Sequence, residues 1–299
     1  MDRPLKWSGC LWQLIVAVML VGPLVATTGE AASLKDVQDR GVLLHLGVPY
    51  ANFITGSDDG LEVELMQAFA DFLQVRYQFV QTTWQKALED VSGKKVKVRG
   101  SDVEILGAVP VRGDVLASGV TVFSWRQDIV DFGTPTFPTQ VWVMARAESD
   151  LRPIIPGRSI QEDIEETLVQ LRNRTVLGVA NTCLDPAIYG LDDRPADVRY
   201  FQGSLNELAP AVMYEAADAT LLDVPDAIVA LRKWPGKIKV LGPVSRPQVM
   251  APAFAKDSDQ LRKAFDRFLQ ALKSQGRYEP LIRKYYPSIF QYFPEFFDH

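Results

Sequence analysis

An arginine and an aspartate occupy similar places in the chain, because each stands at or just beyond the end of a strand-like run. Arg126 follows an apolar run at residues 115–117 and a turn, whereas Asp223 ends the run that begins at residue 218. In an open α/β sheet, ligands bind in the crevice beyond the carboxyl ends of the strands. Arg126 can therefore hold a carboxylate through two parallel, charge-assisted hydrogen bonds. The alternative is a surface arginine that pairs with Asp128 or Asp131.

A small polar turn offers further contacts. Thr182 and Cys183 follow the predicted strand at residues 175–179 and lead into a helix. Helix amino ends present unpaired N–H groups and the positive end of the helix dipole, which suits a carboxylate. Helix capping by Asn181 or Thr182 is the alternative, and both roles can coexist. Asp223 can likewise be either a ligand contact or a structural residue, because its position also suits the N-cap of the helix that follows.

Residues 1–31 have the pattern of a targeting segment. Arg3 and Lys6 form a short basic head, residues 11–25 form an apolar core, and small residues lead to a cleavage point near Ala31. The apolar core is too short to span a bilayer comfortably, although an uncleaved anchor is the alternative. We therefore expect an exported protein.

Composition narrows the classes of function. The 299 residues, of which 47% are hydrophobic, can bury one large core or two modest ones. A net charge of -5 argues against a general nucleic-acid binder and favours a small-molecule partner. With His45 and His299 as the only histidines, we expect no histidine-based zinc site, no Ser-His-Asp triad and no cofactor. Cleavage removes Cys10 and leaves Cys183 as a lone thiol, which excludes an internal disulfide and predicts burial.

The predicted elements alternate as in an α/β protein. Residues 42–48 have the pattern of a buried parallel strand, and an amphipathic helix and a second strand follow them. This order implies a parallel sheet with right-handed crossovers. The polar stretch 146–158 is interpreted as the first of two crossings between lobes. Lobe 1 would then hold residues 32–145 and 248–299, and lobe 2 residues 146–247.

Two segments extend this pattern. Residues 94–105 alternate like a hairpin, whose basic strand from Lys94 to Arg99 is either a solvated edge or a contact for an acidic partner. The tail at residues 289–297 carries five aromatic residues. We expect the tail to pack on lobe 1, and a partner surface is the alternative.

Several of these segments together carry a family resemblance. Gly119-Val120-Thr121-Val122, Arg126 and the run from Val130 to Pro135 resemble the signature of the family 3 extracellular solute-binding proteins, the amino-acid receptors of bacterial ABC importers. Asp218 to Asp223 resembles that family's Asp-Ala-x-x-x-Asp. The chain departs from the family at Phe123, which replaces a threonine, and at Cys183, which replaces a hydroxyl-bearing residue.

The resemblance implies a two-lobe periplasmic-binding-protein-like α/β fold, in which each lobe is a mostly parallel sheet flanked by helices. It implies that Arg126 clamps a ligand carboxylate, that Thr182 is a second contact and that Asp223 takes an ammonium group. The remaining ligand-binding candidates under this resemblance are Tyr50 and Phe53, as stacking aromatics, and Thr121, Phe123 and Cys183.

The function implied is capture of a small amino-acid-like or carboxylate ligand in the periplasm for ABC import, without catalysis. The partners would be that ligand and an ABC permease at the inner membrane, and we expect a monomer. Two alternatives stay open: a periplasmic enzyme of the same fold, resembling cyclohexadienyl dehydratases, and a ligand-sensing domain.

Overall fold

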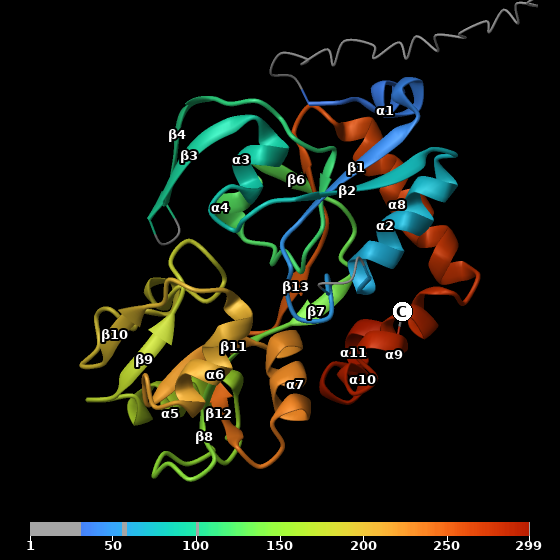
Figure 1. The fold of residues 1–299 in the computed structure, drawn as a ribbon. Helices are drawn as coiled ribbons and strands as arrows, with labels where there is room; N and C mark the ends of the chain where they lie inside the picture. Colours follow the sequence, from blue (N-terminus) through green and yellow to red (C-terminus); the bar gives the residue numbers. More distant parts are fainter. Residues whose placement is uncertain (1–30, 56–58, 100–101, 299) are drawn as a thin grey trace, which may run out of the picture.

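A computed structural model describes residues 31–55, 59–99 and 102–298. The predicted targeting segment lies outside these residues, apart from its last residue, Ala31. Figure 1 shows two α/β lobes connected by a ribbon of two antiparallel strands, β7 (Phe137–Thr139) and β13 (Gln248–Met250). Within the described ranges, no helix is both long and apolar enough to cross a membrane.

Lobe 1 is built on a five-stranded sheet. β1 pairs in parallel with β2 and β5, as the β-α-β-α pattern predicts, whereas β14 runs antiparallel to its neighbours. In sheet order the strands are β2 (Arg76–Gln81), β1 (Val42–Gly47), β5 (Val115–Leu116), β14 (Ala253–Ala255) and β6 (Val130–Phe132). Its helices are α1 (Leu34–Arg40), α2 (Leu61–Phe72), α3 (Ala87–Ser92), α4 (Ser124–Gln127), α8 (Asp259–Ser274) and α9 (Tyr278–Tyr285).

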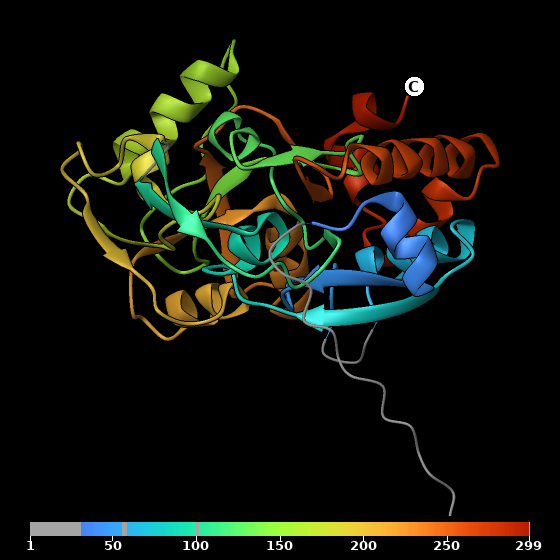
Figure 2. The ribbon, with the colours of Figure 1, turned by 90° about the horizontal axis from the view of Figure 1, so that it is seen from above.

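The longest helix, α8, shows how the sequence dictates this packing. Its apolar residues recur every three or four positions, so they share one face of a helix. That face is buried, as predicted, and Phe265 and Phe268 both lie against Phe69 of α2 with ring centroids 5.4 Å apart. Burial of this face fixes α2 and α8 together on one side of the sheet. Figure 2 shows both helices away from lobe 2.

Lobe 2 has its own five-stranded sheet. In sheet order the strands are β10 (Asp197–Tyr200), β9 (Thr175–Gly178), β11 (Ala219–Asp223), β8 (Val141–Arg146) and β12 (Ile238–Pro243). β8 is antiparallel to both of its neighbours, and the pairs of β9 with β10 and β11 are parallel. The helical segments of this lobe are α5 (Ile160–Gln170), η1 (Pro186–Tyr189), η2 (Leu205–Glu207), α6 (Leu208–Met213) and α7 (Val224–Lys233).

The predicted position of the first crossing is wrong. Residues 141–145 were assigned to lobe 1, but they form most of β8, which pairs with β11 and β12 in the sheet of lobe 2. The chain therefore crosses at β7, before residue 141, and returns through β13. An apolar run of this kind suits a central strand in the sheet of either lobe, because a strand that is buried on both faces needs apolar residues in either sheet.

The hairpin and the aromatic tail complete the fold. β3 (Lys94–Arg99) and β4 (Asp102–Ala108) form the predicted antiparallel hairpin, which reaches from lobe 1 toward lobe 2 in Figure 1 and Figure 2. The tail forms α10 (Ile289–Tyr292) and α11 (Pro294–Phe297). Ile289 is buried as expected, but the ring of Tyr292 lies 5.4 Å from that of Trp142 in β8. The tail therefore contacts lobe 2 as well as lobe 1.

Candidate functional site

Chain segments that follow strands of both sheets meet where the two lobes face each other. Tyr50 follows β1 and Gly119 follows β5, both in lobe 1, whereas Cys183 follows β9 and Asp223 ends β11, both in lobe 2. The Tyr50 hydroxyl donates a hydrogen bond of 2.5 Å to Oδ1 of Asp223 across this junction. The site thus lies beyond the carboxyl ends of strands, which is where α/β sheets bind ligands.

A small cavity lies at this junction. Its volume is about 10 Å³, which is room for roughly one water molecule. Side chains from both lobes surround it, so the lobes must separate before anything larger can enter. The lining residues are Tyr50, Trp84, Gly119, Arg126, Thr182, Cys183 and Leu205.

Arg126 reaches the cavity from α4 and is buried, with 4% of its surface exposed. Its Nη1 donates to the carbonyl of Thr121 at 2.7 Å, and its Nε has no hydrogen-bond partner. Its guanidinium carbon lies 5.1 Å from the ring centroids of both Phe123 and Trp125. Burial lowers the pKa of Arg126, because desolvation disfavours its charged form. An arginine nevertheless stays protonated in proteins, so the cavity has a positively charged wall.

The geometry excludes the alternative of a surface arginine. Arg126 is buried, and Asp131 pairs instead with Lys256 at 3.1 Å. Among the described residues, no carboxylate forms an ion pair with Arg126. A buried charge without a counter-ion is costly, so the position favours an anion from outside the protein.

Asp223 is fully buried, and both of its carboxylate oxygens are engaged. Oδ1 accepts from the Tyr50 hydroxyl and, at 3.3 Å, from the backbone N–H of Asp226, while Oδ2 faces the Cys183 thiol at 3.7 Å. The bond from Asp226 makes Asp223 the N-cap of α7, as one of the two sequence interpretations predicts. Burial raises the pKa of Asp223 to about 6, although its hydrogen bonds oppose that shift.

The turn after β9 holds Thr182 and Cys183 at the cavity. The Thr182 hydroxyl donates to the carbonyl of Val179 at 2.8 Å and accepts from the N–H of Leu184 at 3.0 Å. The Cys183 thiol is buried beside Asp223 and the Thr121 side chain, and burial, followed by the charge of Asp223, raises its pKa to about 12. Cys183 is therefore a protonated thiol at neutral pH, and it donates toward Asp223.

Not every predicted residue lines the cavity. Phe53 lies in the core of lobe 1, with its ring 5.1 Å from that of Phe137 and 5.4 Å from that of Tyr286. Thr121 and Phe123 flank Arg126 instead of facing the cavity themselves. Asp223 lies behind Tyr50 and Cys183, and it does not belong to the cavity wall.

Three lining residues, Trp84, Gly119 and Leu205, were missed as site residues. The sequence marks Trp84 only as a large aromatic residue just before α3, which suits core packing equally well. Its ring meets that of Tyr50 edge-on at 5.7 Å. Gly119 has φ +67°, and a Cβ there would lie 2.7 Å from the Phe53 ring. This conformation and the close contact require glycine. Leu205 carries no signal in the sequence beyond its place in a capping box.

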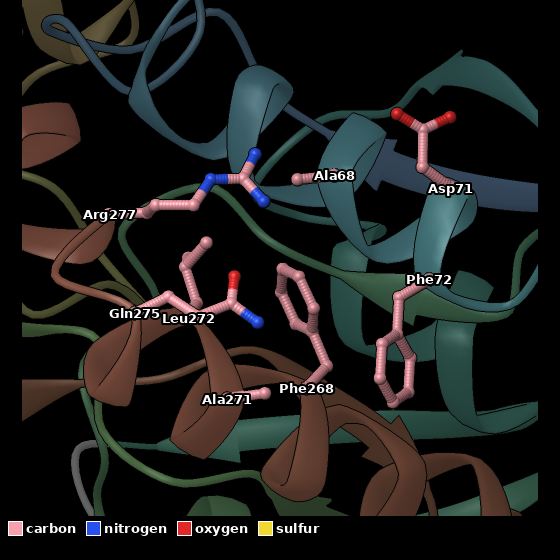
Figure 3. Close-up of a pocket in the computed structure, with 8 residues that line it drawn as sticks. All are labelled: Ala68, Asp71, Phe72, Phe268, Ala271, Leu272, Gln275 and Arg277. Carbon is pink, nitrogen blue, oxygen red and sulfur yellow. The ribbon is translucent and has the colours of Figure 1, made fainter.

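A larger pocket lies elsewhere, between α2 and α8 (Figure 3). Its volume is about 270 Å³, and its apolar lining consists of Ala68, Phe72, Phe268, Ala271 and Leu272. The charged residues around it, Asp71 and Arg277, are exposed to solvent, so neither is a desolvated charge that needs a ligand. The pocket is a surface groove of one lobe, and the small cavity between the lobes is the stronger candidate because it holds the buried guanidinium. Among the described residues, no group of acidic, histidine and cysteine side chains could hold a metal ion.

Glu62 of α2 supports the loop beside the cavity. Its Oε2 accepts from the backbone N–H of Gly119 at 2.7 Å, while Oε1 is buried without a partner. Burial raises the pKa of Glu62 from 4.5 to about 7. The folded protein therefore binds this proton more tightly than the unfolded chain, and the resulting stability is lost as the pH rises through about 7.

We expect Glu62→Gln to remove this pH dependence. At about pH 8 the variant should be more stable than the wild type by about 3 kcal/mol, and at about pH 4 the two should differ little. Urea unfolding at both pH values measures the difference in the free energy of unfolding between the two proteins. This difference reports on Glu62 alone, because the other buried groups titrate in both proteins. A variant that is less stable than the wild type at about pH 8 would contradict this account.

Comparison with known proteins then identifies the family. The family model of the bacterial extracellular solute-binding proteins, family 3, matches residues 110–288, which is more than half of the chain. The chain belongs to this family. Members are extracellular, so family 3 membership implies an exported protein. The matched residues include Arg126, the turn at Thr182 and Asp223.

Several solved structures have a similar fold. A mutant of ArgBP from T. maritima has a TM-score of 0.68 and 23% identity, over 85% of this chain and 99% of that one. The ancestral amino-acid-binding protein AncCDT-1, a precursor of cyclohexadienyl dehydratase, has a TM-score of 0.65 and 19% identity, over 85% and 99% of the two chains. The GluR0 ligand-binding core from Nostoc punctiforme, in complex with L-glutamate, has a TM-score of 0.62 and 18% identity. That match covers 82% of this chain and 99% of the GluR0 chain. These likenesses establish the two-lobe fold.

Proposed function

We propose that this family 3 protein captures a small carboxylate-bearing solute between its lobes and passes it to an ABC permease at the inner membrane. One observation carries the proposal: a buried arginine without an acidic partner lines a cavity that both lobes surround. A ligand carboxylate would neutralise Arg126 and supply the missing acceptor for its N–H groups.

The ligand enters when the lobes separate. The cavity of about 10 Å³ is too small for an amino acid or a comparable acid. The ribbon of β7 and β13 joins the lobes, and such short connections act as hinges in two-lobe binding proteins. Closure then brings Arg126 of lobe 1 and Thr182 of lobe 2 onto the same solute.

Location and partners follow from this role. Residues 1–31 would direct export and be cleaved near Ala31, which leaves a monomeric protein in the periplasm. There the closed, ligand-loaded form would dock on the permease. A ligand-sensing role would use the same closure and differ only in the partner.

We propose binding without turnover. Acid–base catalysis works best with a group whose pKa lies near the working pH. Burial raises the pKa of both Tyr50 and Cys183 at the cavity well above neutral. Asp223, with a pKa of about 6, lies behind them. Incubation with cyclohexadienyl acids, followed by chromatography of the products, tests the enzyme alternative.

A thermal-shift screen of small carboxylates and amino acids tests the proposed function. At about a hundredfold excess over Kd, a ligand of the folded state adds about 2.7 kcal/mol. We expect the melting temperature to rise by roughly 5 °C or more for at least one acid. The primary amide of the same acid is the matched control, because it keeps the shape and lacks the charge. An amide that stabilises as well as its acid would contradict a carboxylate site.

A further inference from the structure

Asp223 is separated from the cavity by the two side chains that bind it. Tyr50 and Cys183 both line the cavity, and both direct their donor atoms to Asp223, at 2.5 Å and 3.7 Å. Asp223 itself has no exposed surface. Its Oδ1 also accepts the N-cap bond from Asp226. In the closed structure, each carboxylate oxygen therefore has a partner within the protein.

The groups that face the cavity are neutral or positive. Arg126 provides a charged donor, whereas Tyr50, Thr182 and Cys183 are uncharged. A carboxylate finds its counter-charge here. An ammonium group finds no carboxylate on the wall, and it would sit in the same small space as a guanidinium, which repels it.

Tyr50 and Asp223 belong to different lobes, so their hydrogen bond breaks when the lobes separate. An ammonium group at Asp223 would prevent that bond from re-forming when the lobes close. The bond between the phenol and the carboxylate is of the short, charge-assisted kind, which is stronger than a neutral hydrogen bond. Its loss would leave the hydroxyl of Tyr50, a residue that is 1% exposed, without that partner. Cys183 adds to this discrimination, because a thiol is a weaker acceptor for an N–H donor than a hydroxyl would be.

We propose that the solute is a small carboxylic acid without an α-ammonium group, and that the hydrogen bonds of Tyr50 and Cys183 to Asp223 set this selectivity. The acid would carry hydrogen, hydroxyl or oxo at the α carbon. This inference rests on the proposed function, because it concerns the same cavity between the lobes.

Isothermal titration calorimetry with matched pairs tests the selectivity. The pairs are alanine with lactate, aspartate with succinate, leucine with 4-methylpentanoate, and glutamate with 2-oxoglutarate. In the pair whose side chain fits, we expect the acid without the amine to bind at least roughly tenfold more tightly than the amino acid.

Two variants test the residues that set the selectivity. Tyr50→Phe removes the donor that covers Asp223, so the ratio of the two affinities should move toward the amino acid by roughly tenfold or more. Cys183→Ser is nearly isosteric and supplies a hydroxyl acceptor, so it should move the ratio in the same direction if Tyr50→Phe fails to fold. Tyr214→Phe is the matched control, since Tyr214 is 83% exposed, and its ratio should equal that of the wild type.

The outcomes distinguish this inference from the proposed function. If the amino acid binds more tightly than its amine-free counterpart, the inference is overturned and the carboxylate site stands. A ratio in both variants equal to that of the wild type overturns the roles of Tyr50 and Cys183. If no acid of any pair binds, the proposed function fails, and the inference fails with it.

Discussion

Arg126→Ala is expected to weaken binding of the carboxylate ligand at least about 100-fold, the largest effect on affinity of any single change in this chain. Arg126 provides the charged donor on the cavity wall, and hydrogen bonds to a charged group contribute about 1.5–3 kcal/mol each. Two such bonds in parallel account for a loss of this size. Calorimetric titration of the variant with the tightest acid of the screen measures it.

Arg126→Lys is the matched control for charge. Lysine keeps the positive charge but lacks the planar fork, so its affinity should lie between those of the wild type and Arg126→Ala. Arg126→Ala should not lower the stability of the ligand-free protein greatly, because removal of an unpaired buried charge also removes its desolvation cost. A folded Arg126→Ala protein that binds as tightly as the wild type would place the site elsewhere.

Phe53→Ala is expected to destabilise the protein by about 3–5 kcal/mol, the largest loss of stability predicted here. The Phe53 ring is fully buried and packs on Phe137, Tyr286 and the close approach of Gly119. Its truncation would leave a cavity in the core of lobe 1. Urea unfolding of the ligand-free protein measures the change.

Phe53→Leu is the matched control, because it keeps most of the apolar volume and should cost clearly less than the alanine variant. The sequence interpretation of Phe53 as a stacking residue makes the opposite prediction. It requires Phe53→Ala to lose ligand affinity roughly tenfold or more while its stability falls by less than about 1 kcal/mol. That pair of results would contradict the core assignment.

The sequence was most informative where structure depends on neighbours in the chain. The apolar face of α8, the β3–β4 hairpin and the position of Arg126 after a strand follow from local periodicity and turn residues. The prediction of a two-lobe architecture depended on the family resemblance. The family match confirms the resemblance, and the solved structures confirm the fold.

What the sequence could not provide depends on distant contacts. β8 is apolar enough for a central strand of either sheet, so its partners alone decide the position of the crossing. Tyr50 and Asp223 are 173 residues apart, and no local pattern indicates that one covers the other. The burial of Phe53 likewise depends on Phe137 and Tyr286, which come from other parts of the chain.

A crystal structure of the protein with its tightest acid tests the central claim most directly, namely that the ligand binds between the lobes on Arg126. We predict carboxylate oxygens within about 3 Å of the Arg126 guanidinium, with Thr182 and Cys183 on the opposite wall. Ligand density in the groove between α2 and α8, or anywhere else outside the junction of the lobes, would contradict the account.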